Sequence, residues 1–156
     1  MGSKKFALYG GVVMLVMGLV SLIPNFEGSQ MGLPMLELNE SYGLFLGYFP
    51  MNILNKLALI AFGIAGIVTS QLKGNALPRS ISFSRAVFFV MGSAAILGAL
   101  PQTSTLFGYW PLFGGEILAH AVFAVLGAYF GFALSYKVHK EIQTKPHLKE
   151  TFQGTR

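Results

Sequence analysis

The sequence predicts an all-α integral membrane protein, a four-helix bundle built from two parallel two-helix repeats with the N and C termini in the cytoplasm. Only 11% of its 156 residues are charged and 53% are hydrophobic, whereas soluble domains carry about 25% charged residues. The hydrophobic residues form four long runs, and most of the basic residues flank these runs at one side. Most of the predicted surface therefore faces lipid and not water.

Four hydrophobic runs are each long enough to cross a bilayer. The predicted transmembrane helices are residues 6–23, 53–72, 81–100 and 114–136, within a single membrane domain over residues 1–156. About 18 to 23 helical residues extend roughly 27–35 Å, which covers a hydrocarbon core near 30 Å. Helices are expected because lipid cannot satisfy free backbone N–H and C=O groups. The two longest segments outside these spans are an outer loop at 24–52 and a cytoplasmic tail at 137–156.

The basic residues set the orientation of the predicted spans. Ten of the eleven Lys and Arg residues lie at one side: Lys4, Lys5, Lys73, Arg79, Arg85, Lys137, Lys140, Lys145, Lys149 and Arg156. The opposite side carries Glu27, Glu37, Glu40 and Glu116, with Lys56 as the one basic exception. The positive-inside rule assigns the basic side to the cytoplasm. We expect a bacterial inner (cytoplasmic) membrane or an equivalent energy-transducing membrane, with anionic lipid headgroups attracted to the basic side.

The two halves of the chain resemble each other. Residues 46–51 (Leu-Gly-Tyr-Phe-Pro-Met) match residues 107–112 (Phe-Gly-Tyr-Trp-Pro-Leu) at an offset of 61. The first and third spans match at an offset of 74, through Val13, Val16, Met17 and Gly18 with Val87, Val90, Met91 and Gly92. Both repeats begin in the cytoplasm, so we expect them to run parallel, related by an axis along the membrane normal. The inverted repeats of many transporters are therefore not indicated.

A Gly-Tyr-aromatic-Pro corner precedes the second and the fourth span. Tyr and Trp favour the headgroup level, and Pro suits the start of a helix. We therefore predict interface or packing roles for these corner residues, with a lipid or partner docking strip as the alternative. The residues are Tyr48, Pro50, Tyr109, Trp110 and Pro111. Gly127 and Gly131 form a G-x-x-x-G pattern, which favours close helix packing inside the bundle or in an oligomer.

Glu116 and His120 are the candidate polar site within the spans. They stand four residues apart and so share one face of the fourth helix. Ionisable residues in a span are costly and are functional candidates by default. One interpretation is a polar pair satisfied by neighbouring helices. The alternatives are a cofactor site, in which His120 ligates a haem or a chlorophyll-type pigment, and a proton relay.

Lys56 and Glu116 are predicted to form a structural polar pair. The repeat aligns Asn55 with Glu116, which places Lys56 at nearly the same depth as Glu116 on a neighbouring helix. A buried charge needs an opposite charge or hydrogen bonds. We therefore expect the ammonium and the carboxylate to pair across the bundle, directly or through water.

Several function classes are not indicated. There is no cysteine and no aspartate, so thiolate metal sites, iron–sulfur clusters and cysteine nucleophiles are excluded. The sequence assembles no set of nucleophile, base and oxyanion donor, so no catalytic residue is expected. It also predicts no metal site and requires no cofactor. The net charge of +5 follows from topology, and we do not expect nucleic-acid binding.

The chain resembles a group of small bacterial four-helix membrane proteins catalogued as domain of unknown function 4383, over about residues 6–136. The resemblance rests on the duplicated Gly-aromatic-Pro corner followed by a polar helix start. In that family the corner leads into an Asn, then a His-Asn pair, then a second His. Asn52 matches the first Asn and His120 the last His, whereas the departures are Asn55, Lys56, Leu59, Phe113, Glu116 and Ile117. The resemblance implies the architecture and no particular activity.

Three functional hypotheses remain open. The first is a non-enzymatic accessory or scaffold subunit of a larger membrane complex, because the chain is small, has 14 Phe and 7 Met residues and lacks a catalytic set. Its partners would be other membrane-protein subunits. The second is a cofactor- or pigment-binding protein that uses His120. The third is a small transporter or channel, which would need a polar path through spans whose middles are almost wholly apolar.

Overall fold

The computed structural model describes residues 2–136 and residue 140. Its elements are α1 (Gly2–Ser21), α2 (Pro24–Glu27), β1 (Gly43–Phe45), β2 (Phe49–Met51), α3 (Ile53–Gln71), α4 (Ala76–Ala99), α5 (Gly115–Ala128) and the π-helical turn η1 (Tyr129–Ala133). Within the described residues, four helices are long and apolar enough to cross a membrane: Gly2–Ser21, Ile53–Gln71, Ala76–Ala99 and Gly115–Tyr136. The prediction of four helices that are long and apolar enough to span a membrane is confirmed.

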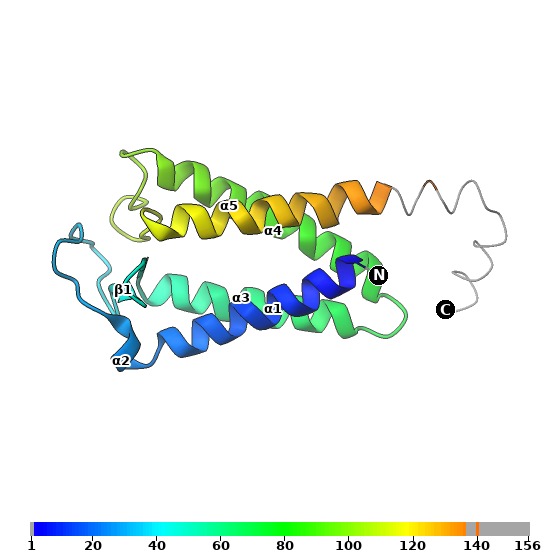
Figure 1. Cartoon of the computed structure of the whole chain (residues 1–156), viewed down its shortest axis with the longest axis horizontal. Helices are drawn as coiled ribbons and strands as arrows, with labels where there is room; N and C mark the ends of the chain where they lie inside the picture. The colour runs from blue at the N-terminus through cyan, green and yellow to red at the C-terminus, as the bar shows by residue number, and fades with distance from the viewer. Residues whose placement is uncertain (1, 137–139, 141–156) are drawn as a thin grey trace.

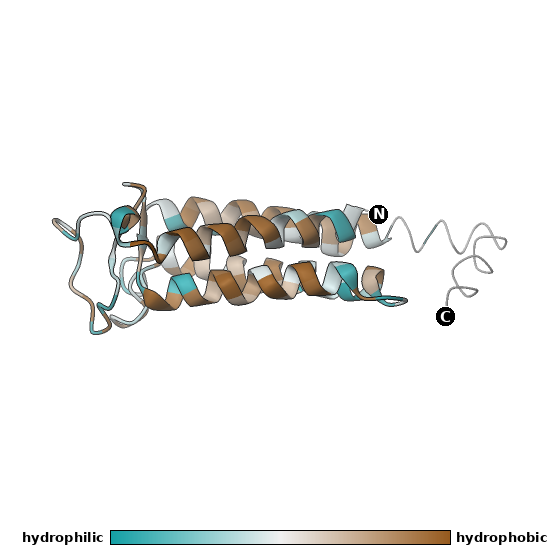
Figure 2. Cartoon of the chain, turned by 90° about the horizontal axis from the view of Figure 1, so that it is seen from below, coloured by the Kyte–Doolittle hydropathy of each residue, from teal (hydrophilic) through white to brown (hydrophobic). Residues whose placement is uncertain are grey.

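The helices form two antiparallel pairs that lie side by side (Figure 1). α1 packs mainly on α3, and α4 packs mainly on α5, while α4 also contacts α1 and α3. One end of the bundle carries the connections at residues 22–52 and 100–114, and we call it the loop end. The other end carries the short connection at residues 72–75, and we call it the turn end. Figure 2 shows hydrophobic residues along the helices between the two ends.

Glycines let the paired helices approach closely. A Cβ atom added to Gly11 would lie 2.8 Å from the carbonyl oxygen of Gly63, and one added to Gly66 would lie 2.6 Å from that of Ala7. Such distances are shorter than van der Waals contact, so these positions exclude larger side chains where α1 crosses α3. Small residues produce this kind of helix packing in membranes, where lipid is as apolar as the side chains.

Gly127 and Gly131 pack inside the chain, against α4. A Cβ atom at Gly127 would lie 2.7 Å from the backbone nitrogen of Phe88, and one at Gly131 would lie 3.0 Å from that of Arg85. The G-x-x-x-G face is therefore covered by α4 in the structure. It serves the contact between α5 and α4.

The interior between the helices is small and mostly aromatic or sulfur-containing. The buried cluster consists of Phe6, Ala7, Met14, Phe83, Val87, Met91 and Ala124. Phe6 stacks on Phe130 with ring centroids 5.0 Å apart, which links α1 to η1. Most other large side chains point outward, and Leu118 and Val125 of α5 are 70% and 69% exposed. A bilayer is the environment that makes such a surface favourable.

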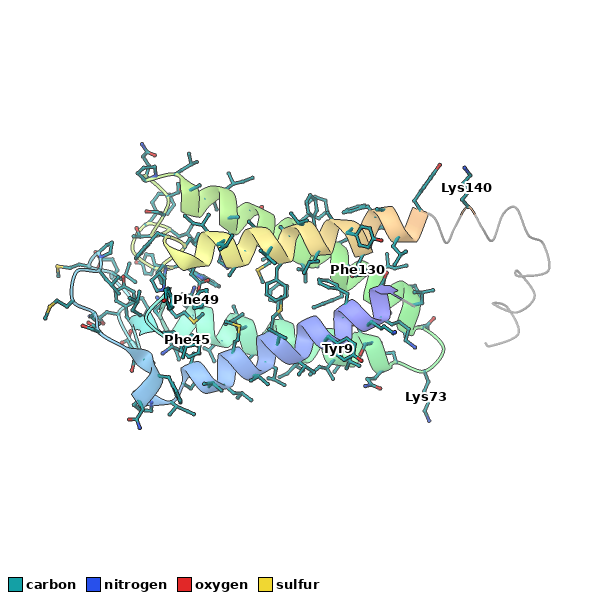
Figure 3. All side chains as sticks on the ribbon, in the orientation of Figure 1. Tyr9, Phe45, Phe49, Lys73, Phe130 and Lys140 are labelled. Atoms are coloured by element: carbon teal, nitrogen blue, oxygen red, sulfur yellow. The ribbon has the colours of Figure 1, made fainter. Side chains whose placement is uncertain are left out.

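The described basic residues other than Lys56 gather at the turn end. Figure 3 places Lys73 and Lys140 at this end, opposite Phe45 and Phe49. Lys4 and Lys5 lie in the first turn of α1, which begins at the same end (Figure 1). Much of the predicted tail at 137–156 lies outside the described residues, including the basic residues Lys137, Lys145, Lys149 and Arg156.

Candidate functional site

Asn52 joins the two halves of the chain at the loop end. Its side-chain oxygen accepts hydrogen bonds from the backbone N–H groups of Leu54 at 3.1 Å and Asn55 at 3.4 Å, which caps α3. Its amide nitrogen donates to the carbonyl oxygens of Tyr109 at 2.8 Å and Leu38 at 3.1 Å. Asn52 is fully buried. One side chain therefore starts α3 and holds both the outer loop and the second corner against it.

Asn55 extends this connection to the second corner. Its side-chain nitrogen donates to the carbonyl oxygen of Pro111 at 3.1 Å, and its side-chain oxygen accepts from the backbone N–H of Asn52 at 3.3 Å. The prolines of the two corners, Pro50 and Pro111, are fully buried. The asparagines of the first half thus fix the position at which the second half begins its last helix.

The aromatic residues of the two corners point outward or line the interior edge. Tyr48 is 75% exposed and Tyr109 is 56% exposed. Trp110 is half-buried and lines a cavity between α3, α4 and α5. The exposed phenol rings lie at one end of the spans, where the headgroup region of a bilayer accommodates tyrosine.

The ion pair expected between Lys56 and Glu116 is not found among the described residues. The Nζ atom of Lys56 donates to the Oγ atom of Ser41 at 2.6 Å and lies 3.5 Å from the Oε1 atom of Glu27. Lys56 was expected to pair with Glu116 because the two residues lie at similar depth along their helices, but its side chain points in another direction around α3. Lys56 follows Asn55, and consecutive side chains point about 100° apart around a helix. Since Asn55 is directed at the second corner, Lys56 reaches α2 and the outer loop instead.

Glu116 and His120 contact each other within α5. The Nε2 atom of His120 lies 3.4 Å from the Oε2 atom of Glu116, and the two side chains are 14% and 6% exposed. The Oε1 atom of Glu116 and the Nδ1 atom of His120 are buried and have no hydrogen-bond partner among the described residues. Each side chain therefore keeps one polar atom that the described protein groups leave unsatisfied, which is unusual in a folded interior.

A cavity of about 80 Å³ lies beside this pair. Its polar lining comes from Asn55, Trp110, Glu116 and His120, and the rest of the lining is apolar. Asn55 and Glu116, which the sequence comparison aligns at an offset of 61, line the same cavity. A space of this size holds a few water molecules or a very small ligand. No group of three His, Cys, Asp or Glu side chains in the described part of the chain is arranged to hold a metal ion.

Sequence reasoning missed the partners of Lys56. Glu27 and Ser41 come from a long connection whose folding no local pattern predicts. The acidic residues at this end and the buried position of Lys56 were visible, but nothing indicated which Glu would reach it. The sequence indicated Asn52 only through the family resemblance and its position at a helix start, and it did not predict the hydrogen bonds that Asn52 makes.

Comparison with known proteins gives the family. The model of a family described as a domain of unknown function (DUF4383) matches residues 4–133, which include both corners, Asn52, Glu116 and His120. No curated protein and no solved structure matches the chain. The matched range covers most of the 156 residues, so the chain belongs to the DUF4383 family.

Proposed function

We propose that this protein is a non-enzymatic accessory or scaffold subunit of a larger complex in the bacterial cytoplasmic membrane. The four apolar helices support a multi-pass membrane location. The cluster of basic residues at the turn end supports cytoplasmic termini and an outer position for the loop end, by the positive-inside rule. The structure of the outer loop supports a role for this loop in binding a partner subunit.

Two methionines carry the proposal. Met31 and Met35 lie on the outer loop and are 92% and 97% exposed. Both residues belong to the connection between α2 and β1 at the loop end, which the proposed topology places outside the membrane. Methionine is a flexible apolar residue that is common at protein-binding surfaces. A pair of fully exposed methionines in a held loop favours a partner subunit that covers them.

The loop that presents these methionines is fixed to the rest of the protein. The backbone N–H groups of Glu37 and Leu38 donate to the carbonyl oxygen of Gly108. The hydroxyl of Tyr42 donates to the carbonyl oxygen of Pro34 at 3.1 Å. Burial raises the pKa of the Tyr42 phenol, which favours the protonated form that donates this hydrogen bond. A partner would therefore meet a pre-formed surface and lose little loop entropy on binding.

Crosslinking at these positions tests the accessory role. A photoreactive amino acid at Met35 is expected to give a defined adduct with a second protein in intact cells. The same amino acid at Lys73, at the turn end, is the control and is expected to miss that adduct. In the variant with the photoreactive amino acid at position 35, an additional Met31→Ser change should weaken the adduct without changing expression. Adducts with lipid alone, or identical adducts from both positions, would argue against a partner at the outer loop.

We also propose that the chain arose from two copies of a two-helix unit. The buried residues of α1 and α4 correspond at an offset of 77: Ser3 with Ser80, Phe6 with Phe83, Met14 with Met91 and Ser21 with Gly98. The contacts between the helices agree with this correspondence. Gly63 contacts Leu15, and the corresponding residues in the second half, Ala124 and Gly92, contact each other. The packing supports an offset of 77 for these helices in place of 74, a shift of nearly one helical turn.

A small-ligand role for His120 is the second candidate. It is favoured by the unsatisfied Glu116 and His120 atoms beside the cavity. Pockets for drug-sized ligands have volumes of about 300–1,000 Å³, so the cavity of about 80 Å³ is too small for a haem or a chlorophyll-type pigment unless α3 and α5 separate. Transport would need a polar route from this cavity to the turn end, and the intervening side chains are largely apolar.

A further inference from the structure

Arg85 is a charged residue whose position is fixed by two contacts from the opposite helix. It lies on α4, and its Nε atom donates a hydrogen bond to the carbonyl oxygen of Gly131 at 2.9 Å. The central carbon of its guanidinium lies 5.1 Å from the centre of the Phe132 ring. Gly131 and Phe132 belong to the π-helical turn η1. Arginine stacked on an aromatic ring and hydrogen-bonded through Nε has few remaining rotamers, so its outer nitrogens are held in place.

The π-helical turn and its glycine make room for this arginine. A Cβ atom on Gly131 would lie 2.9 Å from the Cγ atom of Arg85, so a larger residue would displace the arginine stem. The carbonyl oxygen of Gly131 also accepts a hydrogen bond from the hydroxyl of Ser135 at 2.8 Å. Single π-helical turns inside α-helices often mark functional positions. Here the turn aligns a carbonyl, a glycine and a ring around one guanidinium.

Within the described residues, the guanidinium donates one hydrogen bond, through Nε. The N–H groups of its two Nη atoms have no hydrogen-bond partner in that part of the chain and can donate to a ligand in the open cleft beside them. The cleft has a volume of about 560 Å³ and is lined by Ile81, Arg85, Phe132, Ser135 and Tyr136. None of these described lining residues is acidic. The acidic residue of α5, Glu116, lies in its first turn, far along the helix from η1. The cleft therefore combines a positive charge with hydroxyl groups and apolar walls.

The cleft lies at the basic end of the bundle. The hydroxyl of Ser3 donates to the carbonyl oxygen of Phe130 at 2.8 Å, which sets the first turn of α1, with Lys4 and Lys5, beside η1. Phe130 is also near the end that carries Lys73 (Figure 3). In the proposed topology this end of the bundle faces the phosphate groups of the cytoplasmic leaflet, which is rich in anionic lipids.

We propose that this cleft binds one anionic phospholipid. The phosphate would accept hydrogen bonds from the Nη atoms of Arg85, with Ser135 and Tyr136 at the headgroup, and an acyl chain would lie along Ile81 and Phe132. A soluble anion would leave the apolar walls uncovered, so the lipid is the better fit. The inference does not depend on the proposed partner at the outer loop, since the two surfaces lie at opposite ends of the molecule.

Native mass spectrometry of the full chain, purified in detergent and exchanged into phosphatidylglycerol, tests this site. The wild type is expected to retain one phosphatidylglycerol molecule. Arg85→Lys keeps the charge and loses the guanidinium fork, so the occupancy should fall about ten-fold, the effect of one charge-assisted hydrogen bond. The matched control is Arg79→Lys, an exposed arginine on the same helix, which should leave the occupancy unchanged.

Further measurements distinguish a specific lipid site from nonspecific attraction of anionic lipids to the basic residues. Phe132→Leu keeps an apolar wall and removes the ring under the guanidinium, and it should lower the occupancy about three-fold, a typical cation–π effect. Phosphatidylcholine should not replace phosphatidylglycerol. Equal losses in Arg85→Lys and Arg79→Lys would overturn the proposal. Displacement of the lipid by millimolar inorganic phosphate would overturn it too, because the site would then be one for a soluble anion.

Discussion

Alanine at Gly63 is expected to destabilise the protein by about 2–3 kcal/mol, the upper part of the range of about 1–3 kcal/mol found when a packed contact is overfilled. The added Cβ atom would lie 2.5 Å from the backbone nitrogen of Leu15 and 2.6 Å from its Cβ atom. Because these atoms belong to the backbone and the first side-chain carbon of α1, no rotamer change relieves the clash. The two helices must move apart along their main contact. Reversible unfolding in mixed micelles with a denaturing detergent measures the loss.

The matched control for this change is Gly92→Ala. A Cβ atom at Gly92 would meet only the Cβ atom of Ala124, at 3.7 Å, which is ordinary contact. Alanine has the higher helix propensity, by about 1 kcal/mol, so this variant should be neutral or slightly more stable. Equal destabilisation by both alanines would mean that the close crossing of α1 and α3 does not exist in the membrane.

Alanine at Asn52 is expected to cost about 3–4 kcal/mol, from the lost helix cap and from two part-buried carbonyl groups left without their donor. Asn52 caps α3 and donates to Tyr109 and Leu38. Its loss should also free the second corner from the first. The unfolding assay above measures the stability. Hydrogen exchange should show faster exchange at the amides of Glu37 and Leu38, which bond to Gly108 of that corner.

Two further variants separate the roles of Asn52. Asn52→Asp keeps the oxygen that caps α3 and removes the amide donor, so it should produce most of the loss if the link between the corners dominates. Asn39→Ala, an exposed asparagine in the same loop, should be neutral. A stability of Asn52→Ala within about 0.5 kcal/mol of wild type, the range of ordinary surface changes, would contradict the role given to this residue.

The helices were predictable from the sequence because a bilayer leaves the chain few choices. Hydrophobic length alone located all four spans, since lipid requires closed backbone hydrogen bonding. The predicted ends were less accurate: α1 begins at Gly2 and α4 at Ala76, several residues before the predicted starts. Polar residues such as Lys4 and Arg79 can continue a helix into the headgroup region, and a hydrophobicity pattern does not detect those turns.

The loop end was not predictable in the same way. Its two strands are three residues long, Gly43–Phe45 and Phe49–Met51, too short for a periodic pattern to identify. Tyr42, Phe45 and Met51, which lie in or next to these strands, are buried. The folded loop end brings Glu27 and Ser41 to Lys56. It therefore determines the partner of Lys56, which depth along the helices alone had predicted to be Glu116.

One of the candidate sites was predictable from the sequence and the other was not. The contact of Glu116 with His120 follows from their spacing of four residues on one helix, which the sequence displays. The site at Arg85 depends on η1, and no sequence signal marks a π-helical turn. From the sequence Arg85 was one of ten basic residues that set the topology. Only the positions of the Gly131 carbonyl and the Phe132 ring distinguish it from the others.

Labelling of single cysteines tests most directly whether the four helices cross a bilayer with the loop end outside. The chain has no cysteine of its own, so Met31→Cys and Lys73→Cys each give one reactive site. In intact spheroplasts a membrane-impermeant maleimide is expected to label Met31→Cys and to spare Lys73→Cys, which should react only after the membrane is opened. Labelling of both positions in intact spheroplasts, or of neither until the membrane is opened, would contradict the account.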